Sequence, residues 1–184
     1  MSDVLLVVDP GVRYPAAAVF VNGTLVAASR VKLKSAWAKL GRSERCLTVG
    51  RAICDWFREN CPEQPTKLTY VFEWPLVRGR SSKADPADLF FLNGVGMALA
   101  GLLYDRFHEL KVVEYLPHEW AGTAPKATTG DPLISPRGVR VWSRLTDEEK
   151  KCVVVSHDSV DAIGISLFYL GRFDRVRSFI GASK

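Results

Sequence analysis

The chain has 184 residues, 47% of them apolar, so it is long enough for one domain with its own core and too apolar for a disordered chain. Its four cysteines and three histidines show no zinc-ligand spacing, and no signal peptide or apolar run of about 20 residues is visible, which predicts a cytoplasmic protein with reduced thiols and no membrane contact. The net charge of +5 favours a polyanionic partner such as nucleic acid without identifying one.

Three β-strands are predicted at the start of the chain, and the first of them ends in an aspartate. Val4–Val8 is an uninterrupted aliphatic run, which is typical of a strand buried on both faces, and Asp9-Pro10-Gly11 ends it. Ala16–Val21 and Thr24–Arg30 are β-prone runs joined by Asn22-Gly23, a strong hairpin signal.

The rest of the chain alternates between predicted helices and strands. We expect a helix over about Glu44–Asn60, a strand over Leu68–Phe72 that runs into Glu73, a helix over about Pro86–Leu110, a strand over Lys111–Tyr115 and a last helix over about His157–Leu170. Residues 116–145 are predicted to be a long, partly mobile loop, a kind of segment that is often functional. This order predicts a single α/β domain over residues 1–184, with a mixed central β-sheet flanked by helices.

Four acidic residues suggest a metal site. Asp9 and Glu73 each end a buried strand, and if these strands are parallel neighbours both side chains leave the sheet at the same edge. Asp158 and Asp161 are three residues apart at the start of the last helix, so they share a face. Four converging carboxylates would repel one another, and Mg²⁺ or Mn²⁺ would cancel that repulsion. Two such ions about 4 Å apart can activate water and stabilise the leaving oxygen in phosphodiester cleavage.

Taken singly, these acidic residues have simpler interpretations. Asp9 before Pro-Gly is also typical of a turn, and Glu73 of a solvated strand end. Asp158 is also typical of the first turn of a helix, where a carboxylate complements the dipole. Only the ordered set of four favours the metal site.

Several motifs together resemble a known family. Val7-Val8-Asp9-Pro10-Gly11 followed by a hairpin, Val71-Phe72-Glu73, and His157–Gly164 with its H-D-x-x-D-A pattern resemble the RuvC-type Holliday junction resolvases of the RNase H-like superfamily. Pro117–Trp120, Pro125-Lys126 and Ser143–Leu145 resemble a phage and prophage branch of these proteins. The likeness spans about residues 4 to 172.

The resemblance implies an RNase H-like fold and a homodimeric endonuclease that hydrolyses four-way (Holliday) DNA junctions with Mg²⁺ or Mn²⁺. Lys126 carries over as a catalytic lysine that contacts phosphate, and His157 as a helper at the metal site, although His157 is equally explained as a helix cap. The catalytic metal ligands carry over as Asp9, Glu73, Asp158 and Asp161. Arg13-Tyr14-Pro15 and the long segment from Ala127 to Arg144 depart from the family pattern and leave sequence preference and junction handling open.

Basic side chains near these motifs are candidate DNA contacts. Trp74 is a candidate for stacking on an unpaired base, although a core position explains it as well. A second basic segment contains Lys32, Lys34, Lys39, Arg42 and Arg45. The expected phosphate contacts are Arg78, Arg80, Lys83, Lys126, Arg137 and Arg140. Each cluster is also explained as an ordinary solvated surface.

Glycines in the helix after Pro86 have two explanations. Gly94, Gly96 and Gly101 cost helix stability, so each is expected to allow close packing. The partner is either a second subunit, as the resemblance implies, or the chain's own sheet.

Three other functions remain open. A nuclease of the same fold could act on flaps, other branched DNA or RNA/DNA hybrids, which a substrate panel separates. An actin-like ATPase also opens with an Asp-x-Gly hairpin but needs a longer chain, and ATP turnover would reveal it. A non-catalytic junction-binding module would need no metal pair, which a Mn²⁺ titration tests.

Overall fold

A five-stranded mixed β-sheet forms the centre of the computed structural model, which describes residues 2–11, 14–62, 65–75, 85–121 and 130–172. The strand order is β3-β2-β1-β4-β5. The strands are β1 (Val4–Asp9), β2 (Ala16–Val21), β3 (Thr24–Arg30), β4 (Lys67–Glu73) and β5 (Glu109–Tyr115). The first three pair antiparallel, and β4 runs parallel to both β1 and β5, which confirms the mixed sheet.

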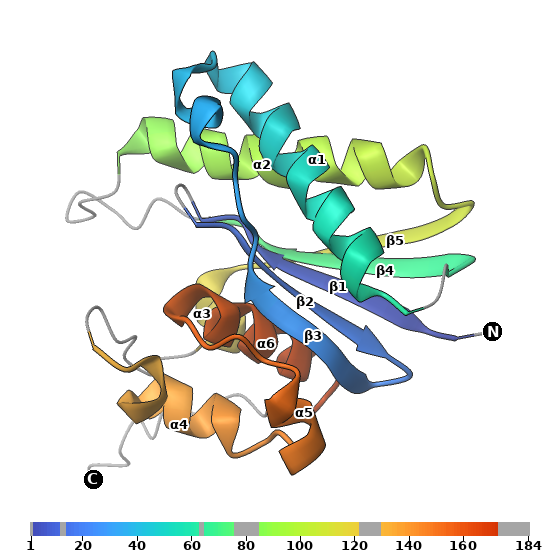
Figure 1. Cartoon of the computed structure of the whole chain (residues 1–184), viewed down its shortest axis with the longest axis vertical. Coiled ribbons are helices and arrows are strands. Elements are labelled where there is room, and N and C mark those ends of the chain that lie inside the picture. Colours follow the sequence, from blue (N-terminus) through green and yellow to red (C-terminus); the bar gives the residue numbers. More distant parts are fainter. Residues whose placement is uncertain (1, 12–13, 63–64, 76–84, 122–129, 173–184) are drawn as a thin grey trace, which may run out of the picture.

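Helices cover both faces of this sheet (Figure 1). One face carries α1 (Arg42–Asn60) and α2 (Pro86–Tyr104), which pack against each other. The other face carries α6 (His157–Tyr169), which packs on β1, β2 and β3. Shorter elements complete the described chain: η1 (Ser35–Lys39), α3 (Pro117–Trp120), η2 (Pro132–Ile134), α4 (Pro136–Trp142) and α5 (Asp147–Lys151).

The aliphatic run in β1 lies at the centre of this arrangement. Val4–Val8 is buried throughout, as expected for a strand covered on both sides. Leu5 and Val7 belong to the core beneath α6, whereas Leu6 and Val8 belong to the core beneath α1 and α2. Because side chains alternate along a strand, the next residue, Asp9, faces α6.

The β2–β3 hairpin turns at Asn22-Gly23, as predicted, with both residues at positive φ (51° and 78°). Val21 pairs with Thr24, so a regular hairpin would place Ser29 opposite Ala16. A register shift between Val19 and Phe20 adds one residue to β3 and places Arg30 opposite Ala16 instead. The bulge therefore turns the Arg30 side chain to the α6 face.

Two predicted boundaries are wrong. The helix expected to reach Leu110 ends at Tyr104, and β5 begins at Glu109 rather than Lys111. Pairing with β4 explains the difference, because Glu109 lies opposite Lys67 and the two side chains form an ion pair at 2.6 Å. The segment 116–145, predicted as a loop, contains α3, η2 and α4 within its described parts.

The outward side of α2 is unusually apolar. Phe90, Met97 and Tyr104 are 78%, 56% and 75% exposed and recur every seven residues, which places them on one stripe. By length and composition alone α2 could span a bilayer, which corrects the expectation that no such segment exists. In this fold its other side packs on α1 and the sheet through Phe91, Val95, Leu99 and Leu103.

The glycines of α2 were expected to allow close packing either within the chain or against a second subunit, and they differ in this respect. A Cβ on Gly96 would lie 2.4 Å from the Phe72 ring, and a Cβ on Gly94 would lie 2.8 Å from the Cys46 sulfur. Packing within the chain therefore explains both. Gly101 has open space where a Cβ would be, so no internal contact requires it.

Candidate functional site

The candidate site begins with two carboxylates at one edge of the sheet. Val8 pairs with Phe72, and Asp9 and Glu73 are the next residues of these parallel strands. Neighbouring strands lie about 4.8 Å apart, so their backbones are close. Val71 lies in the α6-side core, and alternation therefore turns Glu73, like Asp9, towards α6. The expectation that both strands deliver a carboxylate to one edge is confirmed.

The first turns of α6 bring the other two acidic residues. The helix is capped by Ser156, whose side chain accepts a hydrogen bond from the Ser159 backbone N–H at 3.1 Å. The alternative role of His157 as the cap is therefore wrong. Asp161 is only 3% exposed, whereas the Asp158 side chain is 19% exposed.

Trp120 and Arg137 connect Glu73 with Asp161. The Trp120 indole N–H donates to Glu73 Oε2 at 3.1 Å. The Arg137 guanidinium lies 5.1 Å from the centre of the Trp120 ring, and its Nη1 donates to Asp161 Oδ1 at 3.2 Å. Gly164 makes this packing possible, because a Cβ there would lie 2.6 Å from the indole. The Glu73 carboxylate of β4 and the Asp161 carboxylate of α6 are thus linked through the stacked pair of Trp120 and Arg137.

Arg30 holds Asp158. Its Nε donates to Asp158 Oδ2 at 2.8 Å, and its guanidinium lies 4.6 Å from the centre of the Tyr14 ring. Ala16 pairs with both Asp9 and Arg30, so Arg30 lies two strands from Asp9 along the same edge. Each α6 aspartate therefore contacts an arginine.

These residues match a divalent metal by donor type, because Mg²⁺ and Mn²⁺ prefer carboxylate oxygens. The placement at one edge under one helix also matches. Across the described residues, however, no three His, Cys, Asp or Glu side chains gather closely enough to hold one ion. Ion pairs explain part of this separation. Asp158 is paired with Arg30 and Asp161 with Arg137, and these contacts hold the two carboxylates on arginine side chains.

The structure describes only some of the residues predicted to contact DNA. The Trp74 ring lies 5.9 Å from that of Phe72 and packs on the core beneath α1 and α2, as the core interpretation requires. Arg140 is half-buried in α4, one turn after Arg137. Outside the described residues lie Arg78, Arg80, Lys83 and Lys126.

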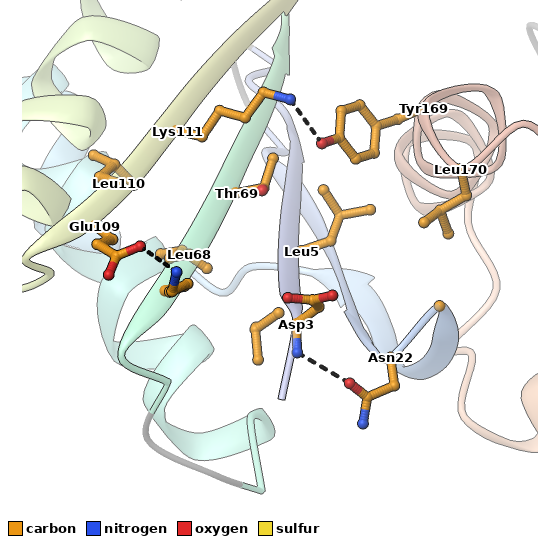
Figure 2. A pocket seen from close by; sticks show the side chains of 13 residues that line it. Asp3, Leu5, Asn22, Leu68, Thr69, Glu109, Leu110, Lys111, Tyr169 and Leu170 are labelled. Carbon is orange, nitrogen blue, oxygen red and sulfur yellow. Dashed lines mark hydrogen bonds and ion pairs between the residues drawn. The ribbon is translucent and has the colours of Figure 1, made fainter. Parts of the chain in front are cut away.

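A separate hollow of about 600 Å³ lies at the opposite edge of the sheet (Figure 2). It is lined by the start of β4 and β5 and the end of α6. Lys67 there pairs with Glu109, and the Lys111 ammonium donates to the Tyr169 hydroxyl at 3.3 Å. Because none of the predicted acidic residues lines it, it is not part of the candidate site.

Two residues of the site were missed as contributors. The sequence motif around Trp120 was noticed only as a family likeness, and nothing local marks its contact with Glu73. Arg30 is the last residue of a predicted strand. A charged side chain at the end of a buried strand is the one feature of the sequence that could have indicated its role. Its orientation depends on the hairpin bulge, which the sequence does not show.

Comparisons with known proteins bear on the fold. No family model matches the chain, and no curated protein matches it. Among solved structures, RuvC of Thermus thermophilus is similar over 93% of this chain and 98% of its own, with a TM-score of 0.55 and 13% identity. T. thermophilus RuvC in complex with a Holliday junction substrate is similar over 92% and 95%, with a TM-score of 0.52 and 14% identity. The chain therefore has a RuvC-like, RNase H-like fold.

Proposed function

We propose that this protein is a divalent-metal-dependent endonuclease that cleaves branched DNA, with four-way junctions as its preferred substrate. The observation that carries the proposal is the edge formed by Asp9 and Glu73, with Asp158 and Asp161 in the first turns of α6, a helix that packs on β1 and β2. The RuvC-like fold supports it, since one similar structure is RuvC with a Holliday junction substrate. A place in the phage and prophage branch and a cytoplasmic location belong to the same proposal.

Asp9, Glu73, Asp158 and Asp161 would hold the metal. When bound, Mg²⁺ or Mn²⁺ supplies positive charge at the scissile phosphate and acidifies a water molecule. The chain's own residues prepare this site. The Trp120 indole N–H fixes the orientation of the Glu73 carboxylate. Arg137 and Arg30 balance the charges of Asp161 and Asp158 in the protein without metal.

Arg137 and Arg140 also belong to the proposed DNA-binding surface. Arg137 contacts a site carboxylate, so its guanidinium is close enough to meet a phosphate brought to that edge. Trp74 follows Glu73 directly and is half-buried, which leaves part of its ring accessible to a base. The other proposed contacts are Arg78, Arg80, Lys83 and Lys126.

We further propose that the enzyme is a homodimer that pairs through α2. Phe90, Met97 and Tyr104 form an exposed apolar stripe, a kind of surface that often marks a protein interface, and Gly101 leaves room for close approach. Leu47 and Val112 extend the apolar surface beside it. A two-fold dimer would match the symmetry of a four-way junction. Sedimentation of the wild-type chain tests this pairing.

Cleavage of a substrate panel tests the proposed function. Purified protein with Mg²⁺ or Mn²⁺ is given a four-way junction, a flap and an RNA/DNA hybrid. The junction is expected to be nicked symmetrically and fastest. Asp9→Asn is expected to bind the junction without cutting it, because it loses a metal ligand and no DNA contact. Wild-type rates from Asp9→Asn would contradict the assignment of the site.

A further inference from the structure

A second hollow, of about 800 Å³, lies beyond the edge strand β3. Its lining comes from the segment Ser29–Lys34 and from residues of α1. Figure 1 shows the chain running from β3 to η1 on the side of the sheet that carries α1. Neither the carboxylate edge nor the hollow of Figure 2 includes Lys32, Lys34 or Arg51, which line this one. Lys32 and Lys34 belong to the second basic segment of the sequence, and none of the three residues is part of the candidate site.

The hollow carries an excess of positive charge. Lys32, Lys34 and Arg51 are exposed, and within the described part of the chain none of them forms an ion pair. The acidic residues in the lining are Asp55, which pairs with Arg58, and Glu59. A concave surface in which cations outnumber carboxylates concentrates anions.

The floor of the hollow is held in place. The Trp56 indole N–H donates to Ser29 Oγ at 2.9 Å, which ties α1 to the end of β3. The backbone N–H of Val31 donates to the Pro15 carbonyl at 2.7 Å and fixes the chain where it leaves the sheet. The cations therefore project from two anchored walls rather than from a loose tail.

Arg30 makes this hollow continuous with the candidate site. It lines the hollow and also donates to Asp158. Two strand spacings separate Asp9 from Arg30, a distance of about 10 Å, which equals the rise of about three nucleotides along the axis of B-form DNA. A strand with its scissile phosphate at the carboxylates would reach the hollow after that interval.

We propose that this hollow is a groove that binds the phosphate backbone of the DNA strand as it continues from the carboxylate edge past β3. Lys32, Lys34 and Arg51 contact phosphates about three or more nucleotides from the cut. The identity of the polymer as DNA rests on the proposed function. A free nucleotide is the weaker candidate, because only a chain uses both the carboxylate edge and the cations beyond Arg30.

The test compares two triple variants in an Asp9→Asn background, in which the junction is not cut. One removes the groove cations: Lys32→Ala, Lys34→Ala and Arg51→Ala. The matched control removes three cations at the opposite edge: Lys67→Ala, Arg106→Ala and Lys111→Ala. Junction affinity is measured by fluorescence anisotropy over a range of salt concentrations. Circular dichroism melting checks that both variants are folded.

The groove variant is expected to bind the junction about tenfold or more weakly, with a salt slope smaller by about 2 to 3, while the control keeps the slope of the Asp9→Asn parent. A junction arm cut back to fewer than about three nucleotides beyond the scissile phosphate should abolish this difference. Equal affinities and slopes for the two triple variants would overturn the groove and leave the nuclease proposal intact. A parent protein that binds no branched DNA would overturn both.

Discussion

Two buried carboxylates, Glu149 in α5 and Asp161 in α6, are each paired with an arginine but are held differently. Glu149 accepts hydrogen bonds from both Nη atoms of Arg172 at 2.7 and 2.8 Å and from the backbone N–H groups of Leu25 and Thr146 at 3.1 and 2.8 Å. The Arg137 Nη1 atom donates a hydrogen bond to Asp161 Oδ1 at 3.2 Å.

We interpret the Glu149–Arg172 pair as structural, whereas we propose a functional role for the Asp161–Arg137 pair. Hydrogen bonds from Arg172 lower the pKa of Glu149 to about 2, with smaller contributions from the backbone donors. Arg172 also donates to the carbonyls of Gly23 and Arg144, so this pair joins the β2–β3 hairpin to the ends of α4 and α6. The Arg137–Asp161 pair lies at the sheet edge beside Glu73, where we propose that a metal and a phosphate enter.

The largest expected effect is a loss of cleavage activity, which should occur when Asp161 is changed but not when Glu149 is changed. Asp161→Asn should lower the rate of junction cleavage about a thousandfold or more, because it removes a proposed metal ligand. Its unfolding free energy should change by about 1 kcal/mol or less, since the lost charge pairing with Arg137 is offset by weaker repulsion from the other carboxylates of the proposed site. Single-turnover cleavage and urea unfolding measure the two quantities. Full activity would place Asp161 outside the catalytic set.

Glu149→Gln should have the opposite effect. Removing one partner of a buried pair leaves the charge of Arg172 without its carboxylate, which costs about 3 kcal/mol of unfolding free energy. Urea unfolding measures it, and cleavage below the melting transition should be unchanged. Glu148→Gln is the control, because its exposed pair with Lys151 should contribute less than about 1 kcal/mol. Equal stability of the two variants would refute the structural role.

Low pH should remove the stabilisation that the Glu149–Arg172 ion pair gives the wild-type protein. The pKa of Glu149 is depressed in the folded state, from 4.5 to about 2, so its contribution is present above pH 4.5 and is lost as the pH falls towards 2. The stability difference between wild type and Glu149→Gln should therefore shrink over that interval. Urea midpoints at about pH 6 and about pH 3 measure it. A constant difference would contradict the assignment of the ion pair.

The smallest expected effect concerns the other arginine. Arg137→Gln should raise the affinity for Mn²⁺ in the absence of DNA by about tenfold, because it removes a cation that competes for Asp161. Arg144→Gln is a suitable control, since its exposed side chain lies two residues beyond α4. Calorimetric titration measures both. Unchanged or weaker Mn²⁺ binding in Arg137→Gln would show that Arg137 does not compete.

Local sequence patterns predicted the part of the site that strands position. The aliphatic runs before Asp9 and Glu73 indicated buried strands, and parallel pairing then fixed both carboxylates at one edge. The spacing of Asp158 and Asp161 likewise placed them on one helix face. These features follow from short-range rules of alternation and helical period.

Tertiary packing decided the rest. The hairpin bulge that turns Arg30 to the α6 face depends on how β3 fits beneath α6 and alongside residues 152–154. Trp120 reaches Glu73 only because Gly164 leaves room in α6 for its ring. The helix boundary at Tyr104 was missed because pairing of Glu109 with Lys67 outweighs helical propensity.

The most direct test of the account is a calorimetric titration of Mn²⁺ into the wild-type chain and into Asp9→Asn and Glu73→Gln. Saturable binding is expected for the wild type, and each substitution is expected to weaken it by about tenfold or more, because both carboxylates would be ligands of the same site. A wild-type protein that binds no Mn²⁺, or variants that bind it equally well, would contradict the claim that these strand ends form a metal site.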